Sequence, residues 1–150
     1  MRPMAQFSVA VVALFGGLLL LSLLFPDEPV PDQDRTLQAL RFSPLPILLG
    51  ASILAPVAEA LVFTFIFIEG AAFTRLSVRF GALVGMLAYS VLYHWSKGPS
   101  GIVISGWVIV VINCMYLAMR AHSVKVAFAF VVLLRWVFVA VAVLLVRVVP

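Results

Sequence analysis

Long apolar runs separated by short polar connections alternate along almost the whole chain. Five runs have the length and hydropathy of transmembrane helices, and they cover residues 6–25, 45–68, 78–95, 101–119 and 126–148. Each span of a membrane needs about 20 predominantly apolar residues, so a chain of 150 residues accommodates about five spans with their loops. The pattern predicts an all-α fold, a polytopic membrane helix bundle with about five transmembrane helices.

The composition supports the same class and excludes others. Hydrophobic residues make up 65% of the chain and charged residues only 11%, whereas in soluble domains about a quarter of the residues are charged. The chain therefore cannot cover itself with a water-compatible surface, and its expected partner is a lipid bilayer. The formal charge is +4, but the basic residues are scattered over the loops without a basic stripe, so we expect no binding to nucleic acid.

The chain is predicted to form a single membrane domain over residues 1–150. The first run, 6–25, is longer than the apolar part of a signal peptide, which favours a retained signal-anchor helix. Residues 26–44 form the only sizeable polar loop, and a helical core follows over 45–148. An N-terminus in the cytoplasm agrees best with the positive-inside rule. Five basic residues then fall on the cytoplasmic side against four outside, and the five are Arg2, Arg75, Arg79, Arg120 and Lys125.

Small and aromatic residues give packing signals. Gly81 and Gly85 form a GxxxG motif, which allows another helix backbone to approach closely. Packing within the chain and packing in a homodimer both explain this motif. Trp136 lies in the middle of the fifth run and is predicted to pack inside the bundle. Cys114 is the only cysteine, which excludes an intrachain disulfide and a cysteine-based metal site, and no metal or cofactor is predicted.

Four polar residues stand out within or at the ends of the apolar runs: Glu59, His94, Asn113 and Arg135. A charge at membrane depth costs at least about 2.5–3.5 kcal/mol, so it normally faces a partner inside the bundle. Glu59 lies nine residues before Ile68, and Arg135 lies nine residues after Val126. With a rise of about 1.5 Å per residue, both lie about 14 Å from the same membrane face.

Two interpretations of Glu59 follow from this placement. In the first, Glu59 and Arg135 form a structural ion pair, with Asn113 adding a hydrogen bond to the same polar cluster. In the second, Glu59 is a catalytic residue that activates water or accepts a proton, together with His94. The spacing favours the ion pair, because an adjacent arginine keeps a carboxylate ionised and makes it a poor proton acceptor.

Two segments resemble the CPBP intramembrane proteases, the family of CAAX-prenyl proteases and bacteriocin-processing proteins. APVAEALVFT, residues 55–64, is similar to the family's first motif, in which a proline precedes a Glu-Glu pair, a Phe and an Arg. Pro56, Glu59 and Phe63 match this motif, whereas Ala60 replaces the second Glu and Thr64 replaces the Arg. SVLYHW, residues 90–95, resembles the second motif and retains its histidine as His94, with Ser90 in place of the usual Phe.

A third segment, AHSVKVAFAFVVLLR, resembles the family's last motif from Ser123 onward. Val131 stands where the second histidine belongs, and Arg135 stands where an Asn belongs. The resemblance implies a helical intramembrane peptidase in which a Glu and two histidines activate water. Valine can neither bind a metal nor donate a hydrogen bond, so the resemblance indicates a degenerate member of the family.

Three functions remain open at this point. A non-catalytic scaffold or accessory subunit of a membrane complex, a pseudoenzyme, agrees best with the lost motif residues. The alternative is a divergent active protease or processing enzyme that uses Glu59 and His94. A proton-carrying transporter subunit ranks last, because proton relays usually contain chains of ionisable groups. The resemblance implies a bacterial inner membrane as the location.

Overall fold

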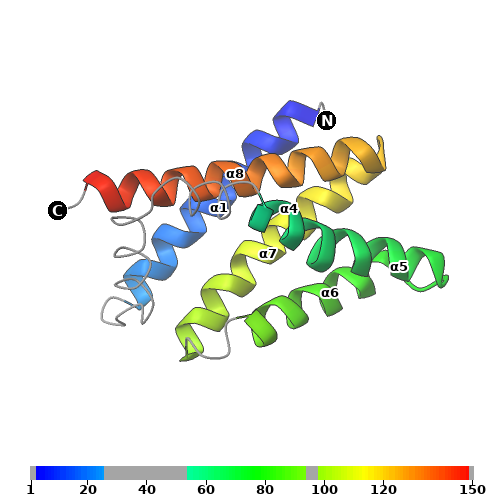
Figure 1. The fold of residues 1–150 in the computed structure, drawn as a ribbon, viewed down its shortest axis with the longest axis horizontal. Helices are drawn as coiled ribbons and strands as arrows, with labels where there is room; N and C mark the ends of the chain where they lie inside the picture. The colour runs from blue at the N-terminus through cyan, green and yellow to red at the C-terminus, as the bar shows by residue number, and fades with distance from the viewer. Residues whose placement is uncertain (1–2, 26–53, 94–97, 149–150) are drawn as a thin grey trace.

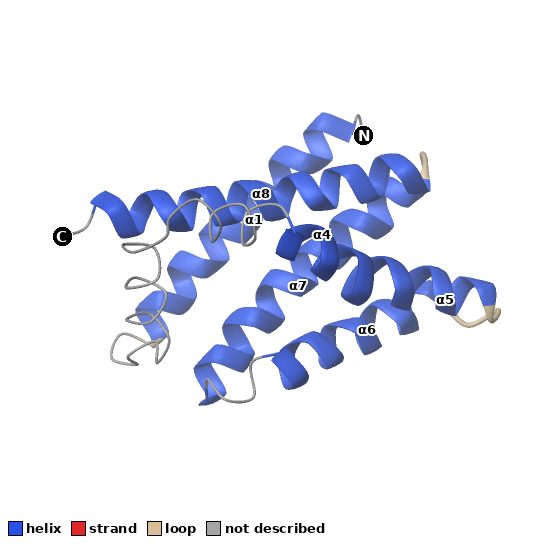
Figure 2. Ribbon diagram, in the orientation of Figure 1, coloured by secondary structure: helices blue, strands red, loops and turns tan. Residues whose placement is uncertain are grey.

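The computed structural model describes residues 3–25, 54–93 and 98–148, and all regular structure in these ranges is helical (Figures 1 and 2). Two of the helical units contain a π-helical segment, labelled η. The elements are α1 (Pro3–Leu24), α4 (Ala55–Glu59), η2 (Ala60–Ile66), α5 (Phe67–Phe73), α6 (Val78–Ala88), η3 (Tyr89–Tyr93), α7 (Gly98–Arg120) and α8 (Val124–Val148). The predicted all-α bundle is thus confirmed.

Four of the described helical units are long and apolar enough to cross a membrane, which makes the chain compatible with an integral membrane protein. These units are Pro3–Leu24, Ala55–Phe73, Gly98–Arg120 and Val124–Val141. The helix from Val78 to Leu92 is apolar but shorter. The second unit continues to Phe73, past the predicted end at Ile68, while residues 45–53 and 94–97 of the predicted spans lie outside the described residues.

Helix α7 forms the centre of the bundle. It contacts α1, α6, η2, η3 and α8, and it crosses the middle of the view in Figure 1. In the most apolar 18-residue stretch of each helix, 50% of the residues of α7 are buried, compared with 11% of those of α1. Helix α1 is therefore peripheral. The core side chains of α7 are Val108, Ile109, Val111, Ile112, Met115, Tyr116 and Met119.

The outer helices turn much of their apolar surface away from the bundle. In α8, Ala127, Val131 and Leu134 are fully buried, whereas Trp136 is 46% exposed. The prediction that Trp136 packs inside the bundle is therefore wrong. Apolar residues occur on every face of this helix, so hydropathy alone does not distinguish the face that meets the bundle from the face that meets lipid.

Helix α5 ends in a Schellman motif. The amide of Leu76 donates to the carbonyl of Ala71 at 2.8 Å, and the amide of Arg75 donates to the carbonyl of Ala72 at 3.2 Å. Arg75 occupies the left-handed position with φ of 60°, where glycine is usual. The turn reverses the chain within four residues, so that α6 packs back along α5.

Gly81 and Gly85 allow this close packing. A Cβ atom at Gly81 would collide with the carbonyl oxygen of Phe67 and would lie 2.7 Å from the Cβ of Ala71. A Cβ at Gly85 would collide with the carbonyl oxygen of Phe63. The GxxxG motif therefore packs α6 against the backbone of η2 and α5 within one chain.

We expect Gly81→Ala to destabilise the protein by about 1–3 kcal/mol, because the new methyl group overpacks a contact formed by backbone atoms. Gly70→Ala is the matched control, since a Cβ at Gly70 meets nothing within 4 Å. Unfolding of both variants in detergent, followed by circular dichroism, measures the difference. Equal stability of the two variants would contradict the packing described for Gly81.

Candidate functional site: a polar column through the bundle

The unit formed by α4, η2 and α5 carries three polar residues at intervals of five: Glu59, Thr64 and Glu69. In an α-helix, residues five apart point about 140° away from each other. A π-helix closes its hydrogen bonds from i to i+5, so residues five apart lie on nearly the same side. Because η2 covers Ala60–Ile66, Glu59 and Thr64 lie on nearly the same side. Glu59, Thr64 and Glu69 each meet a partner on a neighbouring helix, and together they form the layers of a polar column.

The first layer contains Glu59, Arg135 and Tyr89. Arg135 forms a salt bridge with Glu59 through its Nη2 atom, and the same nitrogen donates a hydrogen bond of 2.8 Å to the hydroxyl of Tyr89. Its Cζ atom also lies 5.0 Å from the centre of the Tyr89 ring. Arg135 is only 4% exposed, so α8 is fixed to α4 and to η3 by one buried cation.

The second layer contains Thr64 and Asn113, both of which are buried. The hydroxyl of Thr64 donates to Oδ1 of Asn113 at 2.9 Å, and Nδ2 of Asn113 donates to the carbonyl of Ala82 at 2.9 Å. Asn113 was expected to join the Glu59–Arg135 cluster. Its side-chain hydrogen bonds instead connect η2, α7 and α6 in a layer of their own, because the helix of Glu59 presents Thr64 at the level of Asn113.

The third layer contains Glu69, Arg120 and Tyr116. Nε of Arg120 donates to Oε1 of Glu69 at 2.6 Å, and its Nη2 donates to Oε2 at 2.9 Å. The hydroxyl of Tyr116 donates to Oε1 of Glu69 at 2.8 Å. This bidentate ion pair connects the first turn of α5 to the last turn of α7 and is partly accessible, with side-chain exposures of 30% for Arg120 and 21% for Glu69.

The third layer was missed by the sequence analysis. The second span was predicted to end at Ile68, which placed Glu69 in a loop, and Arg120 was interpreted as topological charge. Asn113, Tyr116 and Arg120 follow one another at i, i+3 and i+7 on α7, which places them on one helical face. The sequence signal that could have predicted the third layer is the series Asn113, Tyr116 and Arg120 on α7, opposite the series that ends at Glu69.

The structure also describes Phe63, Ser90 and Val131, which are further positions of the resemblance. Val131 is fully buried in the core, and the ring of Phe63 packs edge-on against Tyr89 at 5.1 Å. Ser90 is 5% exposed, and its hydroxyl has no hydrogen-bond partner among the described residues. His94 lies outside the described ranges.

The column therefore neutralises charge within the bundle. Both carboxylates that lie on described spans, Glu59 and Glu69, face an arginine. Among the residues that the structure describes, no three His, Cys, Asp or Glu side chains gather as a group that could hold a metal. In comparisons with known proteins, no family model, no curated protein and no solved structure matches the chain.

We expect Glu59→Leu and Arg135→Met each to destabilise the protein by about 3–5 kcal/mol, because each leaves an uncompensated polar group in a buried site. The double variant should be less destabilised than the sum of the two, since it removes both charges together. The measurement is the free energy of unfolding in detergent of the wild type, the two single variants and the double variant, which form a double-mutant cycle.

Glu69→Gln is the control for this cycle, because the Glu69–Arg120 pair is partly exposed and such pairs contribute about 0–1 kcal/mol. Additive effects of the Glu59 and Arg135 substitutions would contradict a direct interaction between the two side chains.

Proposed function

We propose that the chain is a non-catalytic integral membrane protein, a scaffold or accessory subunit of a larger membrane complex. The observation that carries this proposal is the salt bridge of Glu59 with the buried Arg135. A general base must take up a proton near the working pH. A carboxylate that faces a permanently charged guanidinium is stabilised in its ionised form, which opposes proton uptake.

The resemblance to the CPBP proteases supports the same proposal, because several motif residues are replaced in this chain. The residue that replaces the second histidine, Val131, is fully buried and packs in the core. A catalytic role for Glu59 would require Arg135 to leave a position that the Tyr89 hydroxyl also stabilises. The pair therefore serves to hold α8 against α4 and η3.

Orientation and location belong to the same proposal. Arg75, Arg79 and Lys125 are exposed and lie in or next to the turns after α5 and α7, which share the right side of the bundle in Figure 1. Basic residues gather on the cytoplasmic side of membrane proteins. These charges support an N-terminus in the cytoplasm, and the resemblance supports a bacterial inner membrane.

The test compares the wild type with Glu59→Gln/Arg135→Gln, a double variant that removes both charges and keeps two hydrogen-bonding side chains. Native gels of gently solubilised membranes, combined with a survey of newly formed peptide termini in the membrane proteome, measure assembly and cleavage together. For a scaffold, both forms migrate in a complex of the same defined mass, and the peptide termini do not depend on Glu59.

Two results would contradict the proposal. One is a cleavage product that the wild type generates and the folded double variant does not, which would establish a peptidase. The other is migration of the wild type at the mass of the lone chain in native membranes. Near-wild-type circular dichroism of the double variant is the control for its folding.

A further inference from the structure

The hairpin formed by α5 and α6 carries an apolar groove along its outer side. The groove encloses about 310 Å³, and its walls include Ile66, Gly70, Thr74, Leu76, Phe80 and Val84. From Ile66 to Thr74 the helix rises about 12 Å, so the groove is long compared with a single side chain. The hydroxyl of Thr74 donates to the carbonyls of Gly70 and Ala71, which leaves the walls apolar in character.

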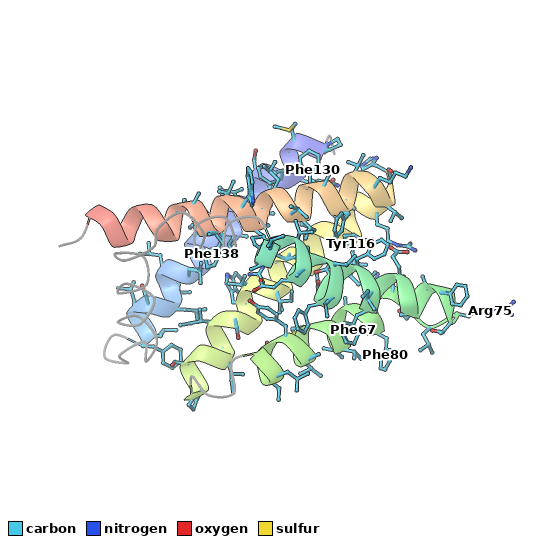
Figure 3. The ribbon with its side chains drawn as sticks, in the orientation of Figure 1. Phe67, Arg75, Phe80, Tyr116, Phe130 and Phe138 are labelled. Atoms are coloured by element: carbon cyan, nitrogen blue, oxygen red, sulfur yellow. The ribbon has the colours of Figure 1, made fainter. Side chains whose placement is uncertain are left out.

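Two cations stand at the end of the hairpin where the groove reaches the turn. Arg75 and Arg79 are exposed, and neither forms an ion pair with any residue in the described ranges, in contrast to Arg120 with Glu69. In Figure 3, Phe67 and Phe80 lie along the hairpin, and the side chain of Arg75 projects from its tip, away from the bundle.

The same tip exposes apolar side chains. Phe73 is 90% exposed and Leu76 is 55% exposed. Arg75 itself occupies the left-handed region, with φ of 60°, where glycine is usual. Exposed aromatic and aliphatic side chains next to unpaired cations fit the headgroup level of a bilayer, where both kinds of group find partners.

We propose that the α5–α6 groove binds an anionic phospholipid. One acyl chain lies along the wall from Thr74 toward Ile66, and the phosphate and its anionic headgroup face Arg75 and Arg79. The charge selects this occupant over a neutral lipid. The walls of the α5–α6 groove are themselves uncharged; the two arginines are sequence neighbours of the wall residues Thr74, Leu76 and Phe80.

Native mass spectrometry of the full chain, released from nanodiscs with equal amounts of phosphatidylglycerol and phosphatidylcholine, tests the proposal. We expect retained phosphatidylglycerol on the wild type. Arg75→Asn/Arg79→Gln should weaken this binding about thirtyfold, since each basic residue near a membrane surface contributes about 1 kcal/mol. Asparagine tolerates the left-handed conformation, so the variant keeps the turn.

Two further variants separate a site from a diffuse charge effect. Gly70→Leu fills the groove at a position where a Cβ meets nothing within 4 Å, and it should release the lipid although both arginines remain. Lys125→Gln removes an exposed cation from the first turn of α8 and should leave the binding unchanged.

Equal retention of both lipids by the wild type would overturn the proposal, because it indicates ordinary boundary lipid. Equal losses in Lys125→Gln and in the arginine variant would also overturn it, because they indicate nonspecific attraction. Unchanged binding in Gly70→Leu would exclude the groove as the site. A partner protein that survives release and displaces the lipid from the wild type would assign the groove to that partner instead.

Discussion

A hydrocarbon environment offers no partner to a charged or hydrogen-bonding side chain, and this constraint organises the bundle. Glu59, Thr64 and Glu69 lie on one helical unit, and each must find its partner on a neighbouring helix. The π-helical turn of η2 brings Glu59 and Thr64 to nearly the same side. A regular α-helix would turn Glu59 and Thr64 about 140° apart, and a charge that faced lipid would cost at least about 2.5–3.5 kcal/mol.

The position of α7 follows from the same constraint. It supplies Asn113 to the second layer and Tyr116 and Arg120 to the third, while its other faces pack against α1 and α8. A helix with polar partners on one face and apolar neighbours on the rest is well suited to the centre. Helix α1 carries no charged residue between Pro3 and Leu24, and it packs at the periphery.

Much of this arrangement could be predicted from the sequence, because hydropathy and helical rise determine it. The helical class and the level at which Glu59 and Arg135 can meet both follow from counting residues. Three features could not be predicted. The helix end after Ile68 was missed because an acid next to a loop usually ends a span. The π-helical turn does not change the hydropathy of the sequence. The exposure of Trp136 could not be predicted either, because the outer face of α8 is as apolar as its buried face.

Stability alone does not account for the polar column. Replacing a buried ion pair by well-packed apolar residues is often neutral or stabilising, and interhelical hydrogen bonds in membranes contribute only about 0.6 kcal/mol on average. The helices of this chain, however, are apolar on nearly every face, so many rotations and shifts of one helix against another have similar packing energies. In the observed register Arg135 reaches both Glu59 and Tyr89, and Asn113 reaches both Thr64 and Ala82. A register that separates these partners leaves a buried polar group unpaired, at a cost of about 1–3 kcal/mol or more, and this penalty favours the observed bundle over others that would bury similar apolar area.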